Sequence, residues 1–217
     1  MVIHVVQPGD SLYRIAQLHS VPLPFLIQQN ELHEPYRLTP GQTIVVPQPE
    51  KTYIVRRGDT LGSIAAQNGT TVMQLWQNNP QLGGTDRIQP GQMLVLSYGN
   101  KLGRFAVNGY AYPSINTNSL NCVLPFLTFL SPFSYKLTPT AELVPPDDSD
   151  LIFRAQRSAV MPIMVVTNIF DEGFSTEALS EVLAYEELQE RLIGNILSEL
   201  TGKNYYGVNM DIEYIAP

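Results

Sequence analysis

The residues best suited to chemistry lie near the C-terminal end of the sequence, in the stretch GVNMDIE at residues 207–213. If this stretch is an extended strand, alternate side chains point to opposite faces, and Asn209, Asp211 and Glu213 share one face. Parallel sheets are normally buried on both faces, where three polar groups would be costly without a role. A buried, charged Asp211 would raise the pKa of Glu213 and keep it protonated as a general acid. The pattern therefore indicates acid–base chemistry, with a polar, solvent-facing edge strand as the alternative.

Alternating strands and helices must position these carboxylates. This alternation predicts an α/β fold with a parallel sheet and crossover helices. In a (β/α)8 barrel the polar face of the last strand would point into the barrel, and its C-terminal end would open at the active site. Strands are predicted for residues 104–110, 126–130, 161–168 and 207–212, and helices for residues 150–158 and 185–200.

This region resembles the family 18 glycoside hydrolases, the chitinase family, whose fourth barrel strand carries the motif Asp-x-x-Asp-x-Asp-x-Glu. The four motif positions align with Tyr206, Asn209, Asp211 and Glu213, so the last two match and the first two depart. The Ser-x-Gly-Gly pattern of the family's third strand is absent from residues 162–168. The resemblance therefore carries over the acid and its neighbour, whereas the two preceding carboxylates of the motif, which share protons along the strand, are replaced by Tyr206 and Asn209.

The resemblance implies a retaining, substrate-assisted mechanism without metal or cofactor. Glu213 would protonate the glycosidic oxygen, and the 2-acetamido oxygen of the substrate would attack the anomeric carbon. Asp211 would orient that acetamide, and Glu213 would then act as the base for water. Further substrate contacts are expected at or near strand ends, where packing or capping is the alternative role. The candidates are Asn209, Tyr110, Tyr112 and Asn168.

The first hundred residues contain an internal repeat. Gly9-Asp10-Ser11-Leu12 recurs 49 positions later as Gly58-Asp59-Thr60-Leu61, and Asn30 recurs as Asn79. Pro-Gly-Gln at residues 40–42 recurs at residues 90–92, one residue further on. Each copy reads as a strand, two short helices and a closing strand, with Asp10 or Asp59 expected to be the N-cap of the first helix. Two copies of one βααβ unit indicate duplicated domains.

Both copies resemble the LysM module, over residues 3–47 and 52–96. The resemblance implies binding of glycans that contain N-acetylglucosamine, such as peptidoglycan or chitin, in a groove between two loops. Helix capping and turn formation are the alternative roles for these loop residues. Trp76 fits either a sugar-stacking platform or, more readily at its helical spacing, the core. The implied groove residues are Gly9, Asp10, Ser11, Leu12, Leu38, Thr39, Pro40 and Gly41 in the first copy, and Gly58, Asp59, Thr60, Leu61, Ile88, Gln89, Pro90 and Gly91 in the second.

Composition limits the remaining classes of protein. The 217 residues are 44% hydrophobic and 15% charged with a net charge of −7, which fits a folded protein and gives no basic face for nucleic acid. No apolar run approaches the length of a membrane span, and no secretory signal is visible. Cys122 is the single cysteine, so no intramolecular disulfide is possible. The three histidines match no metal motif, and we expect no metal site.

The sequence therefore predicts a LysM module at residues 1–48, a second at 50–98, and the first half of a family 18 barrel at 99–217. This order resembles the spore-cortex fragment-lytic N-acetylglucosaminidases of endospore-forming bacteria, and implies a location in the spore cortex, the spore coat or the cell wall. Peptidoglycan or another N-acetylglucosamine polymer is the expected partner. Because four of eight barrel strands are expected, we anticipate weak or no activity from this chain alone. A non-catalytic wall-binding protein and a chitin lectin remain as alternatives.

Overall fold

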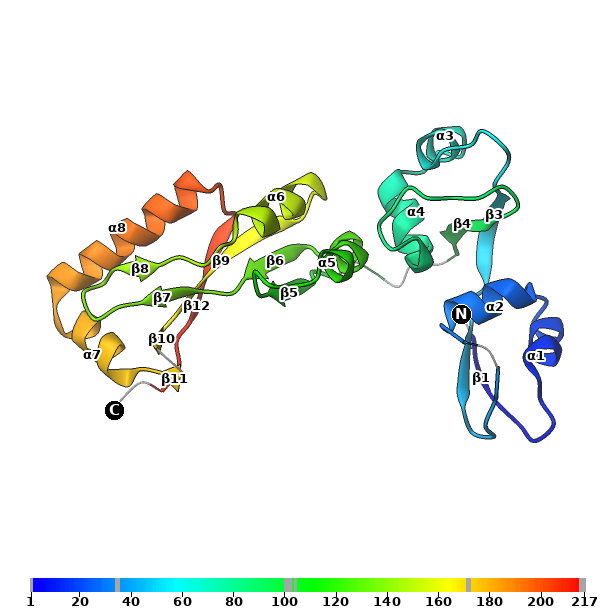
Figure 1. The fold of residues 1–217 in the computed structure, drawn as a ribbon, viewed down its shortest axis with the longest axis horizontal. Coiled ribbons are helices and arrows are strands. Elements are labelled where there is room, and N and C mark those ends of the chain that lie inside the picture. The colour runs from blue at the N-terminus through cyan, green and yellow to red at the C-terminus, as the bar shows by residue number, and fades with distance from the viewer. Residues whose placement is uncertain (1, 34–35, 100–102, 104, 171–172, 215–217) are drawn as a thin grey trace. The chain divides into compact units, whose positions relative to one another are not determined.

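The computed structural model describes residues 2–33, 36–99, 103, 105–170 and 173–214. The chain forms two compact units, residues 1–103 and 104–217, which are treated separately below. None of the helices in the described ranges combines the length and the apolar character that a membrane crossing needs. Figure 1 shows two small helix-and-sheet modules in the first unit, and a strand-and-helix layer structure in the second.

The first module is the expected βααβ unit. Its two strands pair antiparallel, with His4 opposite Ile44, and both helices pack on one face of this small sheet. Ile15, Leu26 and Ile44 are fully buried and form the centre of the core. The elements are β1 (Val2–Val5), α1 (Leu12–Leu18), α2 (Leu23–Gln29) and β2 (Thr43–Val46).

The second module repeats this arrangement with longer strands. Leu61, Ile64, Leu75 and Leu94 take the buried positions that the repeat assigns to them. A β-bulge lies at Leu96, because Lys51 pairs with Ser97 whereas the next residue, Thr52, pairs with Val95. The elements are β3 (Pro49–Ile54), α3 (Leu61–Gln67), α4 (Val72–Asn78), the 3-10 turn η1 (Pro80–Leu82) and β4 (Met93–Tyr98).

The expected N-caps are wrong by one residue. Ser11 and Thr60 cap α1 and α3, because their hydroxyl oxygens accept hydrogen bonds from the backbone N–H groups three residues later. The preceding aspartates instead turn back toward the strand, and accept hydrogen bonds from the N–H groups of Gln7 and Arg56 at 2.8 and 2.7 Å. Both residue types are good caps, and the loop geometry decides between them.

The second unit is built on parallel strands, which confirms the α/β expectation. The strands β5, β6, β9 and β12 are neighbours in that order, and every pairing among them is parallel. The short β7 continues along β9 beyond β6 and forms an antiparallel hairpin with β8. The strands are β5 (Asn108–Ala111), β6 (Phe129–Pro132), β7 (Tyr135–Leu137), β8 (Leu143–Val144), β9 (Met161–Thr167), β10 (Ile169–Phe170), β11 (Gly173–Phe174) and β12 (Gly207–Asp211).

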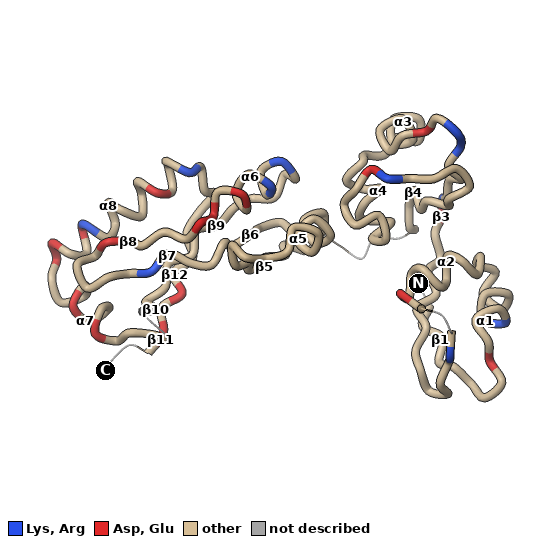
Figure 2. The backbone as a smooth tube through the Cα atoms, viewed as in Figure 1, with Lys and Arg blue, Asp and Glu red and all other residues tan. Residues whose placement is uncertain are grey.

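Helices connect and cover these strands (Figure 1). The two helices predicted from the sequence are present as α6 and α8, whereas α5, α7 and the two hairpins were not anticipated. In Figure 2 the helix α7 contains acidic and no basic residues, in line with the acidic composition of this unit. The helices are α5 (Thr117–Val123), η2 (Leu124–Phe126), α6 (Ser149–Arg157), α7 (Thr176–Ala184) and α8 (Glu186–Gly202).

The first two strands of this unit begin later than predicted. The stretch predicted at 104–110 forms a strand only from Asn108, and its first residue lies outside the described residues. The stretch predicted at 126–130 begins as the 3-10 turn η2, because Pro125 fixes a turn conformation and offers no backbone N–H. The strand β6 therefore starts at Phe129, where both Thr128 and Phe129 donate to the carbonyl of Val107.

A buried polar cluster joins α6, α8 and β7. The carboxylate of Asp148 is fully buried and accepts hydrogen bonds from the hydroxyls of Tyr135 and Tyr205 and from the ammonium of Lys203, the last at 2.8 Å. The hydroxyl of Tyr135 also lies 2.8 Å from Glu199. Removing one member of such a cluster leaves a buried charge with fewer donors, so we expect the cluster to be important for stability.

We predict that Tyr135→Phe destabilises the second unit by about 1–3 kcal/mol, because the hydroxyl shared between the buried Asp148 and the half-buried Glu199 is lost. Urea unfolding of the full chain at neutral pH, followed by tyrosine fluorescence and circular dichroism, measures the change. Tyr185→Phe is the control, since Tyr185 is 56% exposed. Equal midpoints for the two variants would contradict the assigned role.

The same cluster predicts a loss of stability in base. Burial raises the pKa of Tyr135 and Tyr205 well above the usual value of about 10. Above that pH the unfolded chain releases protons that the folded chain retains, so stability is full below about pH 10 and falls as the pH rises further. The urea midpoint of unfolding should fall from pH 8 to pH 10 and further at pH 11, and it should fall less for Tyr135→Phe than for the parent chain. Equal falls of the midpoint in both proteins would contradict this prediction.

Candidate functional site

A groove of about 310 Å³ lies on the first module, between its two predicted recognition loops. Asp10, Ser11 and Leu12 line one side and Leu38 the other, as expected. The remaining predicted residues, Gly9, Thr39, Pro40 and Gly41, belong to the same turns and do not line the groove.

The glycines of these turns have a conformational role. Gly9 and Gly41 have φ angles of +88° and +89°, and their counterparts Gly58 and Gly91 have +91° and +87°. Residues other than glycine rarely adopt these φ angles. Turn formation, the alternative to glycan binding, therefore explains why glycine recurs at these positions in both modules.

Four groove residues were not predicted. Tyr13 and Tyr36 are 59% and 42% exposed, and Leu23 and Ile27 of α2 form an apolar floor between them. Exposed aromatic rings beside an apolar floor are suited to packing on the apolar face of a sugar ring. The available signal was the presence of two tyrosines in or beside loops, but loop position alone does not show which way a ring points.

The carboxylate of Asp10 stabilises the first loop of the groove. The backbone N–H of Gln7 and the imidazole of His4 both hydrogen-bond its carboxylate, at 2.8 and 3.0 Å, and in that order they lower its pKa. In the second module, the backbone N–H of Arg56 and the hydroxyl of Tyr53 donate hydrogen bonds to the carboxylate of Asp59 in the same way. These aspartates therefore hold their loops, and in the first module the Asp10 side chain also contributes to the groove wall.

The second module places Trp76 in its core. The indole is half-buried against the core cluster with Val72 and Ile88, and its Nε1 donates to the carbonyl of Thr85 at 3.0 Å. These contacts favour the core alternative over a sugar platform. Of the predicted groove residues here, Leu61 is buried, Asp59 and Ile88 are half-buried, and Gly58, Thr60, Gln89, Pro90 and Gly91 are exposed.

In the second unit a pocket of about 260 Å³ opens at the C-terminal ends of β5, β6 and β12. Its lining includes Tyr110 and Tyr112, two of the predicted substrate contacts, together with Asp211. Phe133, which was not predicted, completes the aromatic wall, with its ring centroid 5.3 Å from that of Tyr112. The pocket therefore brings one predicted carboxylate together with three aromatic rings.

A hydrogen bond between Asn209 and Tyr110 shows that the sheet is strongly curved. The Asn209 amide donates to the Tyr110 hydroxyl at 2.8 Å, although β5 and β12 are three strand positions apart in the sheet. In a flat sheet that separation would be roughly 14 Å, too far for two side chains standing on one face. Curvature of this kind is that of a barrel wall, with Asn209 on its inner face.

The polar face of β12 is more enclosed than its apolar face. Asn209 and Asp211 are half-buried, whereas Val208 and Met210 are 40% and 46% exposed. The expectation that both faces of this strand are covered is therefore wrong for the described residues. The reason is that α8 packs beside β12 and that, among the described residues, β12 pairs with no strand other than β9.

Glu213 is exposed and does not line the pocket that contains Asp211. The enclosed cavity expected around both carboxylates is therefore not formed by the described residues. The backbone of Glu213 is nevertheless held, because its N–H donates to Oδ1 of Asn168 at 3.0 Å and its carbonyl accepts from Nδ2 of Asn168 at 2.8 Å. Asn168 is fully buried and also bonds Ser175, which favours the packing alternative for this predicted sugar contact.

Known proteins are similar to the two modules and to the chain as a whole. The LysM domain model matches residues 4–47 and 53–97. "Putative sporulation-specific glycosylase YdhD" of Bacillus subtilis (strain 168) is 28% identical, over 100% of this chain and 51% of that protein. The "Cortical fragment-lytic enzyme" of Bacillus anthracis is also 28% identical, over 98% of this chain and 50% of that protein.

A solved structure is similar over nearly the whole chain. The spore cortex-lytic enzyme SleL of Bacillus megaterium QM B1551 is 26% identical with a TM-score of 0.71, and the match covers 99% of this chain and 51% of that protein. The chain thus spans about half the length of the relatives it matches.

We predict that Tyr13→Ala combined with Tyr36→Ala weakens retention of the chain on insoluble peptidoglycan. Each exposed ring that stacks on a sugar contributes about 0.5–1.5 kcal/mol, so the dissociation constant is expected to rise about five- to 150-fold for the pair. Co-sedimentation over a range of peptidoglycan concentrations measures it. Tyr185→Ala, which removes an exposed ring from the second unit, should bind like the parent chain; an unchanged constant for the double variant would remove the groove from the account.

Proposed function

We propose that this chain, which carries two LysM domains and is related over its whole length to spore cortex-lytic enzymes, binds peptidoglycan and presents the catalytic carboxylates of an N-acetylglucosaminidase. LysM domains bind peptidoglycan, and the groove beside Tyr13 and Tyr36 is the proposed contact surface in the first module. Two modules on one chain raise the effective concentration of each at a repeating polymer, so that two weak sites give firm attachment. The spore cortex or the cell wall is the proposed location.

The observation that carries the catalytic proposal is the pocket at the C-terminal ends of the parallel strands. Asp211 lies there beside Tyr110, Tyr112 and Phe133, at the edge where barrel enzymes place their chemistry. The aromatic rings offer a surface for a sugar, and the carboxylate lies within reach of a group bound against them. A sugar-sized pocket with one carboxylate and an aromatic wall supports glycan cleavage better than any other chemistry.

The proposed reaction is retaining and uses the substrate's own acetamide. Glu213 donates a proton to the glycosidic oxygen while the 2-acetamido oxygen attacks the anomeric carbon, and the leaving sugar departs with that proton. Asp211 orients the acetamide and balances the positive charge of the oxazolinium intermediate. Glu213, now a carboxylate, removes a proton from the water that opens the intermediate, which restores both the enzyme and the acetamide.

A second candidate function is attachment to the wall without catalysis. It is favoured by the exposure of Glu213, because a general acid needs a raised pKa and a surrounding that excludes water. In this case the LysM modules act as in the first proposal, and the second unit contributes no turnover. A preference for chitin over peptidoglycan would change the ligand of the modules and leave this distinction intact.

We predict that Glu213→Gln lowers the release of reducing sugar from cortex peptidoglycan fragments by about 10²–10⁴-fold, because the substituted amide donates no proton to the leaving oxygen. Glu187→Gln is the matched control, as it removes one exposed carboxylate from α8. Retention on insoluble peptidoglycan should be the same for all three chains.

Two outcomes decide between the candidate functions. Activity in the parent and the Glu187→Gln chain, with loss in the Glu213→Gln chain, supports the hydrolase. Equal release of sugar by all three chains contradicts the role of Glu213, and no release by any of them, with retention intact, supports attachment alone.

A further inference from the structure

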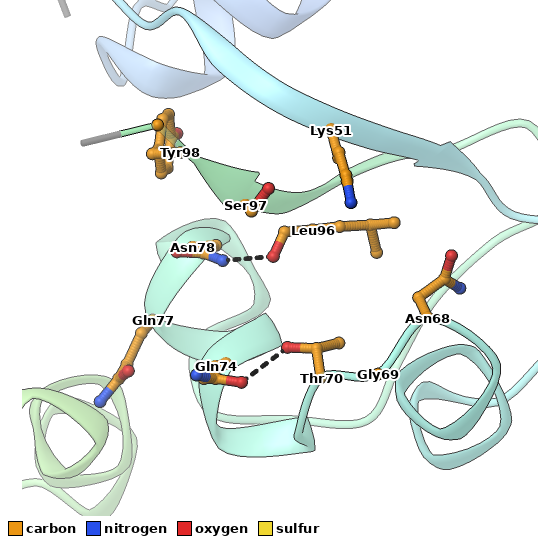
Figure 3. A pocket seen from close by; sticks show the side chains of 11 residues that line it. Lys51, Asn68, Gly69, Thr70, Gln74, Gln77, Asn78, Leu96, Ser97 and Tyr98 are labelled. Atoms are coloured by element: carbon orange, nitrogen blue, oxygen red, sulfur yellow. Dashed lines mark hydrogen bonds between the residues drawn. The ribbon is translucent and has the colours of Figure 1, made fainter. Parts of the chain in front are cut away.

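A separate pocket of about 460 Å³ lies in the second module, away from its predicted recognition loops (Figure 3). None of the residues expected to form the glycan groove of this module, at 58–61 and 88–91, lines it. The walls come from the end of α3 and the turn after it, one face of α4, the start of β3 and the bulged end of β4. The lining residues with polar side chains are Lys51, Asn68, Thr70, Gln74, Gln77, Asn78, Ser97 and Tyr98.

The pocket presents hydrogen-bonding groups that are already held in position. The Oε1 of Gln74 accepts from the Thr70 hydroxyl at 2.8 Å and from the N–H of Thr71 at 3.2 Å, which leaves its amide Nε2 as a donor. The Nδ2 of Asn78 donates to the carbonyl of Leu96 at 2.8 Å, which leaves its Oδ1 as an acceptor. Figure 3 shows both amides anchored in this way, so that a ligand meets a preset donor and a preset acceptor.

Lys51 gives the pocket a positive charge. No aspartate or glutamate lines the pocket, and in the described part of the chain Lys51 has no ion-pair partner within 4 Å. In Figure 3 its side chain extends from β3 toward Leu96. The half-buried Tyr98 contributes a ring, and burial raises the pKa of its hydroxyl, so the hydroxyl stays neutral and donates. The carboxylate of Glu50 accepts from the Ser97 hydroxyl at 3.4 Å but does not line the pocket, so Lys51 is the one charged lining residue. A polar pocket lined by one cation favours a polar ligand that carries an anionic group.

The first module shows that the fold does not require these polar residues. At four of the eight matching repeat positions it has apolar side chains, and Phe25, which replaces Gln74, is only 3% exposed. The other four positions are polar in both modules, with His19, Gln28, Gln29 and Gln48 in the first. Apolar side chains thus replace half of this polar lining in the first module, including the donor Gln74 and the cation Lys51, although both modules share one backbone plan. The matched pairs are Val2 with Lys51, Val21 with Thr70, Phe25 with Gln74, and Pro47 with Ser97.

We propose that this pocket binds a carboxylate-bearing peptide branch of peptidoglycan, so that the second module reads the peptide while the LysM grooves read the sugar. The proposal rests on the proposed function, since it takes peptidoglycan as the polymer that the chain binds. Side-chain amides pair with peptide groups as both donor and acceptor, and Lys51 pairs with the terminal or side-chain carboxylate. The volume is sufficient for about two residues of such a branch.

The test uses the full chain and two defined probes, muramyl dipeptide and the tetramer of N-acetylglucosamine. Lys51→Met should weaken binding of muramyl dipeptide about tenfold, because one charge-assisted hydrogen bond is lost, and leave the tetramer unaffected. Arg157→Met is the matched control, since it removes an exposed positive charge from the second unit. Calorimetric titration gives both constants, and circular dichroism verifies that each variant is folded.

A second variant fills the pocket instead of removing its charge. Gln74→Phe introduces the residue that the first module has at this position, and should abolish the response of the Asn68 and Asn78 side-chain amide signals to muramyl dipeptide in NMR spectra. Equal affinity of Lys51→Met and the parent chain for muramyl dipeptide, or shifts confined to residues 58–61 and 88–91, would overturn the proposal. If the pocket proposal alone is wrong, the chain still binds the tetramer of N-acetylglucosamine. If the proposed function is wrong, the chain binds neither probe nor insoluble peptidoglycan.

Discussion

The structure depends on an asparagine amide that hydrogen-bonds both backbone groups of a single residue on a distant segment. An amide carries a donor and an acceptor at the spacing of a peptide group, so it substitutes for a strand partner where no strand is available. Because the asparagine ends a helix or a strand, the bond joins that end to the segment it faces. The pairs are Asn30 with Val45, Asn79 with Val95, and Asn168 with Glu213, at 2.8–3.0 Å.

This interaction has different consequences in the two units. In the modules it joins the second helix to the closing strand, while separate backbone hydrogen bonds join the two loops: Gly41 donates to Val6 in the first module, and Gly91 to Val55 in the second. In the second unit it orders the backbone of Glu213 while the side chain stays exposed. The groove of the first module is thus lined entirely by residues of that module. The strand that carries Asp211 has a neighbour on one side only among the described residues, which is β9.

Much of this organisation was predictable, because it rests on local patterns. The 49-residue repeat defined both modules, and alternation on residues 207–213 placed Asn209 and Asp211 together on the inner face. Some errors are local, such as the N-caps at Asp10 and Asp59, and those at the second unit's site concern contacts between distant residues. Asparagine at a strand end suits sugar binding and backbone pairing equally, and the partner of Asn168 lies 45 positions away. The inward direction of Phe133 and the exposure of Glu213 likewise follow from neighbours in space, which no local pattern encodes.

Hydrogen exchange at the backbone amide of Glu213 is the most direct test of this account. NMR exchange rates on the full chain should show this amide protected, although it lies beyond the last residue of β12. In Asn168→Ala we predict that it exchanges at the rate of an unbonded amide, while the amide of Val95, held by Asn79, keeps its protection. An unchanged rate for Glu213 in that variant would contradict the claim that the Asn168 amide holds the carboxylate-bearing segment in place.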